Sequence, residues 1–484
     1  MATWLLTLEA LDASGRPVTL RYSQGRYDDP DDNDWDPRIQ QPGLYRAGLF
    51  AGDLLSAQRS GYGETTLVNL DGGLNYLADY AVDGRQMTLS LADDGQVREI
   101  LSGTVSRLAD GDGEVSIKLR DPVETLQQPH PAETYAGTNV LPDGLEGTED
   151  DIAGQQKPQV FGEVRNATPV PVNTSRLIYQ VSSLDDCRVT AVYDKGAVIT
   201  RGADYTSLAQ MQSTAPAAGQ FRAFRGFFRL NASPAGEITC DAETSKPNGG
   251  DVFAGIAAAR GLSVRAEDVA ALNAYGRVRL YMTDATATAE LLDRIAISIG
   301  GYWAFEDGET LAVGELSAPV DEGLELHPDE TMNPSRSATG AGSNGLPIWR
   351  VTVNADRIET VQSDVLGSVS DERRARLKNQ TRKAVGTRQA TRDRHPLADE
   401  ITIDSVLASL AAARSVAERL VALLGVRRDV VSIDARLLEL ERITVSSCYR
   451  TYSPRLGYDT GRVMMVVGNT LNARNGAITL NLWG

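Results

Sequence analysis

The stretch MTLSLADDGQVREILSGTVSRLADGDGEVSIKL, residues 87–119, decides the fold class. Apolar and polar residues alternate up to an Asp-Gly pair at 94–95, and they alternate again after a second turn, DGDG, at 110–113. Period-two alternation broken by Asp-Gly turns is typical of antiparallel hairpins. The stretch therefore predicts consecutive antiparallel strands within a small barrel or sandwich.

Similar strand patterns occur at both ends of the chain, with helical patterns between them. We predict a mainly β protein with α/β inserts, built from tandem β-barrel or sandwich domains, a small helix-hairpin module and one long helix in the C-terminal half. The expected parts are an N-terminal β-barrel-like domain at 1–125, a linker and second β domain at 126–245, a small α/β module at 246–318, and a C-terminal β-barrel-like domain with a basic insertion and the long helix at 319–484.

Asp251 can cap a short helix that ends near Gly261, and two further segments have the 3.6-residue period of an amphipathic helix. The first opens at Asp284 or Thr286 and ends at Gly300-Gly301, directly before a predicted hairpin with an Asp-Gly turn. The second is expected to start near Asp404 and to stop at Gly425, because a glycine commonly ends a helix at this position. Apolar residues recur along it at intervals of four and three.

Composition excludes several classes of protein. The 484 residues carry a net charge of −17, which disfavours non-specific binding to nucleic acid. No apolar run approaches the length of a membrane helix, and the N-terminus lacks the basic start of a secretory signal. The three cysteines lie far apart with no CxxC spacing, which favours buried free thiols in a reducing cytosol.

The stretch DDPDDNDWDPR at 28–38 holds six aspartates. Tested as an EF-hand loop, it has Asp34 where glycine is required and Gln40 where a bidentate glutamate is required. An acidic hairpin loop is the default interpretation, and weak cation binding is the alternative. Its functional interpretation is an acidic contact with a partner subunit or with the lumen of a ring, made by Asp29, Asp31, Asp32 and Asp34.

A basic stretch at 371–394 has nine Lys or Arg residues against three acidic ones. It has no interleaved aromatic residues, so it does not look like a surface that stacks nucleic-acid bases. A solvated helix or loop is one interpretation, and contact with an acidic face of a neighbouring subunit is the other. The candidate contact residues are Arg373, Arg374, Arg376, Arg382 and Lys383.

Recognisable catalytic chemistry is missing from the sequence. The histidines, His130, His327 and His395, each precede a proline, which opposes helical metal-ligand spacing, and we expect them in surface loops. GAGSNG at 340–345 matches a dinucleotide fingerprint but lacks the required strand before it and helix after it. There is no GxSxG sequence. We predict no enzyme activity, no cofactor and no metal.

Several segments, in order, resemble the tail-tip or baseplate hub proteins of long-tailed bacteriophages and gene transfer agents. They span most of the chain from about 70 to 484 and include GLNYLADYAVDGRQMTLSL with ILSGTVSRL, KPQVFGEVRNATPVPVN with LIYQV and VYDKG, ATAELLDRIAISIGGYWAFEDGETLAVGEL, and GRVMMVVG with ITLNLWG.

The resemblance implies tandem β-barrel-like domains with inserted modules, arranged as a closed, often trimeric ring at the distal end of the tail. Such hubs join the tail tube or distal tail protein to fibre and tip proteins, hold the tape-measure protein and let DNA pass without specific binding. The protein would then be assembled in the bacterial cytoplasm and located in the virion. Some relatives carry peptidase or lysozyme domains or a four-cysteine iron-sulfur cluster, and three scattered cysteines do not match the latter.

Other functions remain as alternatives. The chain would form a six-fold ring if it were a distal-tail adaptor. A receptor-binding fibre module would expose aromatic platforms, for which the chain has only five tryptophans. A cell-wall hydrolase would clear peptidoglycan.

Overall fold

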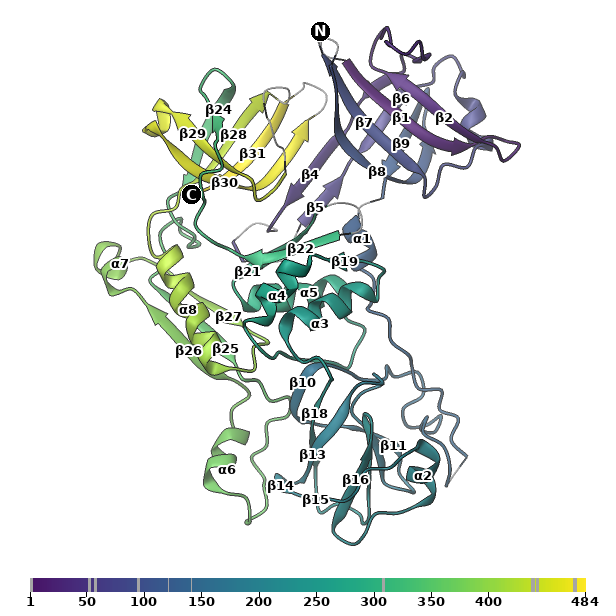
Figure 1. The fold of residues 1–484 in the computed structure, drawn as a ribbon, viewed down its shortest axis with the longest axis vertical. Coiled ribbons are helices and arrows are strands. Elements are labelled where there is room, and N and C mark those ends of the chain that lie inside the picture. Colours follow the sequence, from purple (N-terminus) through teal and green to yellow (C-terminus); the bar gives the residue numbers. More distant parts are fainter. Residues whose placement is uncertain are drawn as a thin grey trace. The chain divides into compact units, whose positions relative to one another are not determined.

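The computed structural model describes residues 3–50, 54–55, 59–93, 96–120, 122–140, 142–306, 310–436, 440, 444–472 and 477–484 (Figure 1). It is mainly β, with 42% of residues in strands and 17% in helices, as the alternating patterns predicted. The chain forms two compact units. Unit 1 combines Met1–Thr125, Ala318–Gly340 and Arg428–Gly484, and unit 2 combines Leu126–Ser317 and Ala341–Arg427.

The first sheet of unit 1 contains the stretch that decided the fold class. Its seven strands lie in the order β2 (Pro17–Ser23), β1 (Thr3–Leu11), β7 (Gln86–Asp93), β8 (Gln96–Asp110), β9 (Glu114–Leu119), β6 (Glu64–Val68) and β3 (Ile39–Gln41). The predicted meander is β7, β8 and β9, which pair antiparallel as neighbours. A 3-10 helix, η1 (Asn75–Asp79), precedes β7.

The second sheet of unit 1 joins the two ends of the chain. Its main path is β23 (Leu324–Leu326), β29 (Cys448–Ser453), β30 (Tyr458–Asn472), β31 (Ala477–Trp483), β28 (Val430–Arg436) and β24 (Thr331–Ala338). Strand β30 also pairs with β4 (Leu44–Gly48), which in turn pairs with β5 (Arg59–Tyr62). A short 3-10 helix, η3 (Pro454–Leu456), links β29 to β30. N-terminal and C-terminal segments therefore share one hydrogen-bonded sheet.

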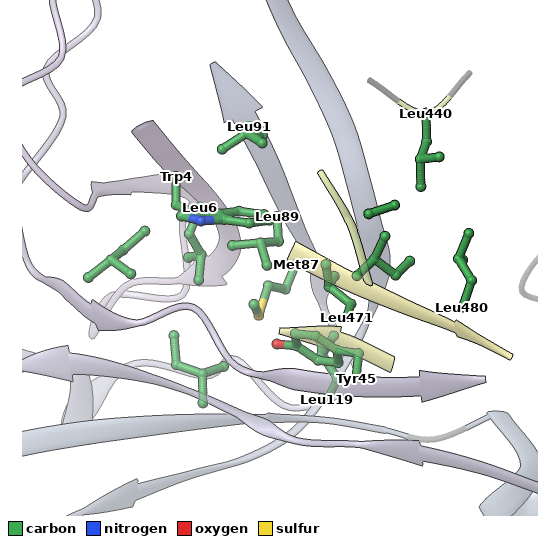
Figure 2. Close-up of a cluster of buried hydrophobic side chains, with 14 of the residues drawn as sticks. Trp4, Leu6, Tyr45, Met87, Leu89, Leu91, Leu119, Leu440, Leu471 and Leu480 are labelled. Carbon is green, nitrogen blue, oxygen red and sulfur yellow. The ribbon is translucent and has the colours of Figure 1, made fainter. Parts of the chain in front are cut away.

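One hydrophobic core serves both sheets of unit 1 (Figure 2). Trp4, Leu6 and Leu89 come from the first sheet and are almost fully buried. Leu471 and Leu480 come from β30 and β31 and belong to the same cluster. Burial of apolar surface is the main stabilising term in folding, so this shared core explains why the two sheets form one unit.

Two five-stranded sheets form the first part of unit 2, and one of them includes β20 from beyond the bounds predicted for the second β domain. One sheet has the order β14 (Ala197–Val198), β13 (Arg188–Asp194), β18 (Ile238–Glu243), β10 (Gln159–Ala167) and β20 (Arg279–Met282). The other has the order β11 (Val170–Asn173), β12 (Ile178–Gln180), β17 (Phe227–Leu230), β16 (Gln220–Phe224) and β15 (Thr200–Arg201). Buried residues from both sheets form one core, and α2 (Leu208–Ser213) adds Met211 to a second cluster.

Between Gly249 and Glu315 the chain also forms three helices and a three-stranded sheet. The helices are α3 (Gly249–Ala258), α4 (Ala266–Asn273) and α5 (Thr288–Ser298). The strands are β19 (Ser263–Val264), β22 (Thr310–Glu315) and β21 (Gly301–Phe305). The predicted hairpin is β21 paired with β22, and the Asp-Gly part of its turn lies outside the described residues. The sequence patterns did not predict α4.

The rest of unit 2 is another three-stranded sheet, β26 (Arg382–Thr387), β25 (Arg350–Ala355) and β27 (Glu400–Asp404). Helix α8 (Leu410–Leu424) packs on β25 and β26, where a Cβ added at Gly386 would lie 2.4 Å from a backbone oxygen of the helix. The helix starts after Ser409, whose hydroxyl accepts a hydrogen bond from the Ala412 amide. Asp404, the start expected from the sequence, ends β27 instead. The remaining helices are α1 (Pro122–Leu126), α6 (Asp371–Leu377) and α7 (Gln389–Arg394).

Across the described residues, none of the six sheets closes into a barrel. The barrel form of the prediction is therefore replaced by open sheets, of which the two large sheets of unit 1 share one core and the two five-stranded sheets of unit 2 share another. In the seven-stranded sheet the end strands β2 and β3 do not pair with each other. The loop between them forms an isolated bridge to β2, from Asp36 to Tyr22.

Candidate functional site

The acidic loop, which we define as residues 24–38, connects the two end strands of the seven-stranded sheet. It is not the hairpin expected from the sequence, because β2 and β3 are not neighbours. The Ser23 amide donates to the Asp36 carbonyl at 2.8 Å, and the Asp36 amide donates to the Arg21 carbonyl at 3.0 Å. Further on, the Val68 amide donates to the Arg38 carbonyl at 2.8 Å. The loop thereby ties together two sheet edges.

Asp29 organises the tip of the acidic loop. Its carboxylate accepts hydrogen bonds from the Trp35 indole at 2.6 Å, the Asp31 amide at 2.8 Å and the Asn33 side chain at 3.2 Å. The Trp35 bond, then the Asp31 and Asn33 bonds, lower the pKa of Asp29, because each favours the charged form. This candidate contact residue is therefore engaged within its own loop.

Arg38 fixes the end of the acidic loop. Its guanidinium pairs with Asp36 at 2.6 Å and with Asp71, on the turn before η1, at 2.7 Å. The hydrogen bonds from Arg38 lower the pKa of Asp71, so that carboxylate is charged at neutral pH. Two of the acidic residues in this region thus serve the local fold.

The other candidate aspartates point outward. Asp31, Asp32 and Asp34 are exposed, and within the described part of the chain none of the three forms an ion pair. Asp32 has φ +59°, a left-handed conformation that Asp and Asn tolerate better than most residues. These three carboxylates are available to a partner.

Beneath the loop tip lies a pocket of about 300 Å³. Its wall consists of loop residues, among them Tyr27, Asp29, Asp31 and Trp35, and its remaining lining comes from β1, β7 and β8. The Tyr27 and Trp35 rings meet edge to face with their centroids 5.6 Å apart. No pattern in the sequence indicated this pocket, because it depends on the loop folding back over the sheet.

The basic stretch is largely occupied by contacts within unit 2. Arg373, on α6, donates to the Gly196 carbonyl and places its guanidinium 3.7 Å from the centroid of the Tyr193 ring. Arg374 donates to two backbone carbonyls of the preceding segment, those of Leu366 and Val369. The Arg373 contacts attach α6 to β13 and the turn after it, and the Arg374 bonds hold the segment before α6, so neither arginine is a free surface cation.

Arg376 and Arg382 converge on Asp356. Both lie 3.5 Å from its carboxylate, which Arg279 also contacts. Lys383 lies next to them on β26 and is exposed. The solvated helix that the sequence allowed for this stretch forms only in part, because α6 ends at Leu377 and Lys383 belongs to a strand.

A buried ion network crosses the sheet of β13, β18, β10 and β20. Glu163 is 2% exposed, and its carboxylate contacts Arg279 at 2.8 Å, Arg277 at 3.0 Å and Arg165 at 3.2 Å. Burial raises the pKa of Glu163, but the three arginines outweigh it and the net shift is downward. Glu243 pairs with Arg277 at 2.8 Å and extends the network.

The sequence held a signal for this network. The segments EVR at 163–165, DAE at 241–243 and RVR at 277–279 each place two charges around one buried apolar residue. Residues two apart on a strand lie on the same face, so each segment presents a charged face and an apolar face. Which segments would pair was not predictable from this spacing.

His130 differs in burial from the expectation that the histidines lie in surface loops, whereas His327 and His395 are not buried. His130 is 5% exposed, its ring packs edge to face on Phe161, and its Nδ1 lies 3.3 Å from the Thr288 hydroxyl. Burial, with Arg260 nearby, lowers the pKa of His130 to about 4. Proline after histidine indicated a loop, but this loop docks on the start of α5. His327 stacks on Tyr452 and is partly exposed.

The cysteines are buried and free, as expected. Burial raises the pKa of Cys187 to about 12, which suppresses the reactive thiolate. Among the residues that the structure describes, no cluster of three or more His, Cys, Asp or Glu side chains is arranged to hold a metal ion. In the same residues, no helix is long and apolar enough to cross a membrane.

No protein-family model and no curated protein matches the chain. Solved structures that resemble it include a tail protein from Neisseria meningitidis, with 10% identity, a TM-score of 0.44, and coverage of 99% of this chain and 96% of that one. The 43 kDa tail protein of prophage MuSo2 from Shewanella oneidensis has 10% identity, a TM-score of 0.43, and coverage of 100% and 98%.

The virion of a native gene transfer agent also resembles the chain, with 16% identity, a TM-score of 0.20, and coverage of 51% of this chain and 79% of that one. The likeness to phage tail proteins and gene transfer agents that the sequence segments indicated is thus found among solved structures.

Proposed function

We propose that the protein is a structural component of a phage tail, located in the virion. The more specific proposal is a ring-shaped hub at the tail tip or baseplate, which joins the tail tube or distal tail protein to fibre and tip proteins. It would be assembled in the bacterial cytoplasm, in contact with the tape-measure protein. A homotrimer is the expected ring.

The observation that carries this proposal is the architecture of unit 1. The hub resemblance implies β domains with inserted modules, and here β4 from the N-terminal part pairs with β30 from the C-terminal part. Unit 2 is inserted between the segments of unit 1 in the sequence. A chain built this way presents several rigid, mainly β bodies for contacts, which suits a scaffold in a symmetric assembly.

The proposed subunit contacts combine the exposed aspartates Asp31, Asp32 and Asp34 with exposed cations of a neighbouring subunit. Lys383 is the first candidate in the basic stretch. Arg382 is the second, since its side chain is 55% exposed although it also pairs with Asp356. The side chains of Arg373, Arg374 and Arg376 contact their own unit. Complementary charges at a rim speed association and suppress wrong partners more than they add affinity.

The net charge of −17 supports the proposal that DNA passes without being held. Phosphates are repelled by an acidic wall, so an acidic lumen would let the genome slide. A strongly positive lumen in an assembled ring would contradict this part.

Imaging of tail particles that carry a labelled copy of the chain tests the position and the subunit number together. A three-fold ring at the distal tip is expected. A six-fold ring would support the distal-tail adaptor instead, and label on the fibres would support a receptor-binding module. The proposal assigns no catalysis to the chain, so clearing of peptidoglycan by the pure protein would contradict it.

The contact proposal has its own test. Replacing Asp31, Asp32 and Asp34 together by Asn should lower the fraction of assembled rings at low salt, measured by native mass spectrometry. The deficit should shrink as salt rises, because salt screens the same charges in the unmodified protein. Equal assembly of the two proteins at every salt concentration would show that the acidic loop is only a solvated connection.

A further inference from the structure

We propose that the pocket beneath the acidic loop is a binding site for the alkylguanidinium or alkylammonium group of an arginine or lysine side chain. This assignment does not rest on the hub function. It rests on the shape of the pocket, on the rings and carboxylates in its wall, and on the finding that Asp29 and Asp31 form no ion pair among the described residues; the charge of Arg21 lowers the pKa of Asp29 without pairing with it.

The pocket matches a long, flexible cationic side chain in size and lining. Its volume of about 300 Å³ is at the lower end of ligand pockets, which suits one side chain rather than a whole cofactor. Leu5 and Val97 give part of the lining an apolar character, and Val97 is 54% exposed. The methylene stem of a lysine or arginine buries favourably against such a surface while its head stays polar.

The wall supplies two aromatic rings and two carboxylates for the charged head. Tyr27 and Trp35 meet edge to face, and Asp29 and Asp31 lie in the same wall. A cation over the face of tryptophan or tyrosine is attracted by the ring quadrupole, most strongly for tryptophan. Carboxylates accept the hydrogen bonds that guanidinium and ammonium groups donate.

The charge of the loop is not balanced by its own arginines. The loop has six aspartates against two arginines, a net charge of −4. Arg26 pairs with Asp28 and Arg38 pairs with Asp36. Neither Asp29 nor Asp31, the two that line the pocket, forms an ion pair in the described part of the chain.

The electrostatics of Tyr27 agree with an anionic pocket. Burial raises the pKa of the Tyr27 phenol, and the charges of Asp29 and Asp31 raise it further. Asp29 itself stays charged, because hydrogen bonds from Trp35 and from the Asp31 amide lower its pKa. The field that disfavours a phenolate favours a cation in the same place.

Trp35 provides a direct readout of binding. The structure describes all five tryptophans, and the other four, Trp4, Trp303, Trp349 and Trp483, are buried. Changes in quenching of tryptophan fluorescence by acrylamide therefore report mainly on Trp35. A Trp35→Phe variant identifies the signal that belongs to it.

The experiment titrates the full chain with N-acetyl-arginine amide and, as an uncharged match of the same shape, N-acetyl-citrulline amide. The arginine compound should protect Trp35 from acrylamide at a concentration at least about threefold lower than the citrulline compound. The difference should shrink in 0.5 M salt, where the Debye length is only about 4 Å. Equal protection by both compounds, or protection by neither, would overturn the assignment.

Two variants that each remove one negative charge distinguish binding in the pocket from general attraction to the acidic loop. Asp31→Asn removes a carboxylate of the pocket wall, whereas Asp32→Asn removes the same charge from a neighbouring residue outside the lining. We expect Asp31→Asn to weaken binding of the arginine amide by a factor of about two to five, the range of exposed ion pairs, and Asp32→Asn to weaken it less. Equal weakening by both would refute a defined pocket in favour of diffuse attraction.

Asp32 suits this role because its left-handed φ is one that asparagine also adopts. Circular dichroism of both variants, compared with the unmodified chain, confirms that the fold is intact. Asp29 is left unchanged in this test, since its carboxylate holds Trp35 in place.

The same amide distinguishes two sources of the cation. If a second copy of the chain supplies it, an excess of N-acetyl-arginine amide should lower the sedimentation coefficient of the chain's own oligomers. Oligomers that persist while the amide protects Trp35 would identify a different protein as the source. Failure of amide binding leaves the hub proposal standing, because ring position and subunit number are measured independently.

Discussion

At the scale of single residues, Asp29 differs from the neighbouring aspartates in its contacts. It is one of six aspartates in a stretch that looks uniform, yet only its carboxylate accepts hydrogen bonds from Trp35, Asn33 and the Asp31 amide. Asp34, five residues later, is exposed. The difference comes from which side chain the loop turns inward.

Replacing Asp29 by Ala should release Trp35 and raise its quenching by acrylamide. Asp34→Ala, the control, should leave quenching close to that of the unmodified protein. The lowered pKa of Asp29 predicts how this depends on pH. The carboxylate contributes fully above the unfolded value of 3.8, and the contribution is lost as pH falls through the lower folded pKa. Quenching that stays constant in Asp29→Ala would show that Trp35 is held by packing alone.

His130 predicts a second pH dependence. Its pKa is about 4 in the folded chain and 6.5 when unperturbed, so the unfolded state binds the proton first as pH falls. Stability is therefore lost between about pH 6.5 and 4. Urea unfolding should show that acidification from pH 7 to 5 costs the unmodified protein roughly 1–2 kcal/mol more than His130→Gln.

The control for His130 is His327→Gln, whose side chain is partly exposed and faces Glu325. This variant should keep the acid sensitivity of the unmodified protein. An identical pH response in the His130→Gln variant would mean that His130 gains its proton as easily in the folded state as in the unfolded state.

At the scale of elements, strands β10, β18 and β20 are held together by charge as well as by an apolar core. Glu163 on β10 contacts Arg279, the first residue of β20, and Arg277, which lies two residues before it. Removing one partner of a buried charge pair leaves the other charge uncompensated, which costs more than the pair itself contributes.

We expect Glu163→Gln to lower the free energy of unfolding of unit 2 by about 2–4 kcal/mol, measured by urea titration. The expected cost is smaller than for a fully buried pair because the Arg277 side chain is 47% exposed. Glu133→Gln is the matched control, since Glu133 is 79% exposed and pairs with Lys157, and it should cost less than about 1 kcal/mol. Similar losses of unfolding free energy in the two variants would show that the buried network contributes no more than an exposed ion pair.

The whole molecule consists of two compact units with their own cores. Units of this kind unfold separately unless a large apolar interface couples them. Calorimetry should therefore resolve two transitions. Leu89→Ala, in the core of unit 1, should lower one of them, since such a truncation costs about 2–5 kcal/mol. Glu163→Gln should lower the other. A single transition that both variants shift equally would mean that the units unfold as one.

The sequence by itself determined the local elements. Alternation in residues 87–119 predicted β7, β8 and β9, and an apolar period with a terminal glycine predicted the end of α8. The three scattered cysteines without CxxC spacing predicted buried free thiols, and the structure has them buried and free. These features depend on residues a few positions apart, and a pattern of that length is visible in one chain.

Only the tertiary structure decided which elements meet. β4 pairs with β30, more than 400 residues later, and no local period encodes that partner. The loop that carries the aspartates is hydrogen-bonded at both ends of the seven-stranded sheet and covers a pocket. Three charged segments that are far apart in the sequence form one network around Glu163. Strand partners are selected by the fit and burial of whole faces in the folded chain, and that free energy belongs to no single segment.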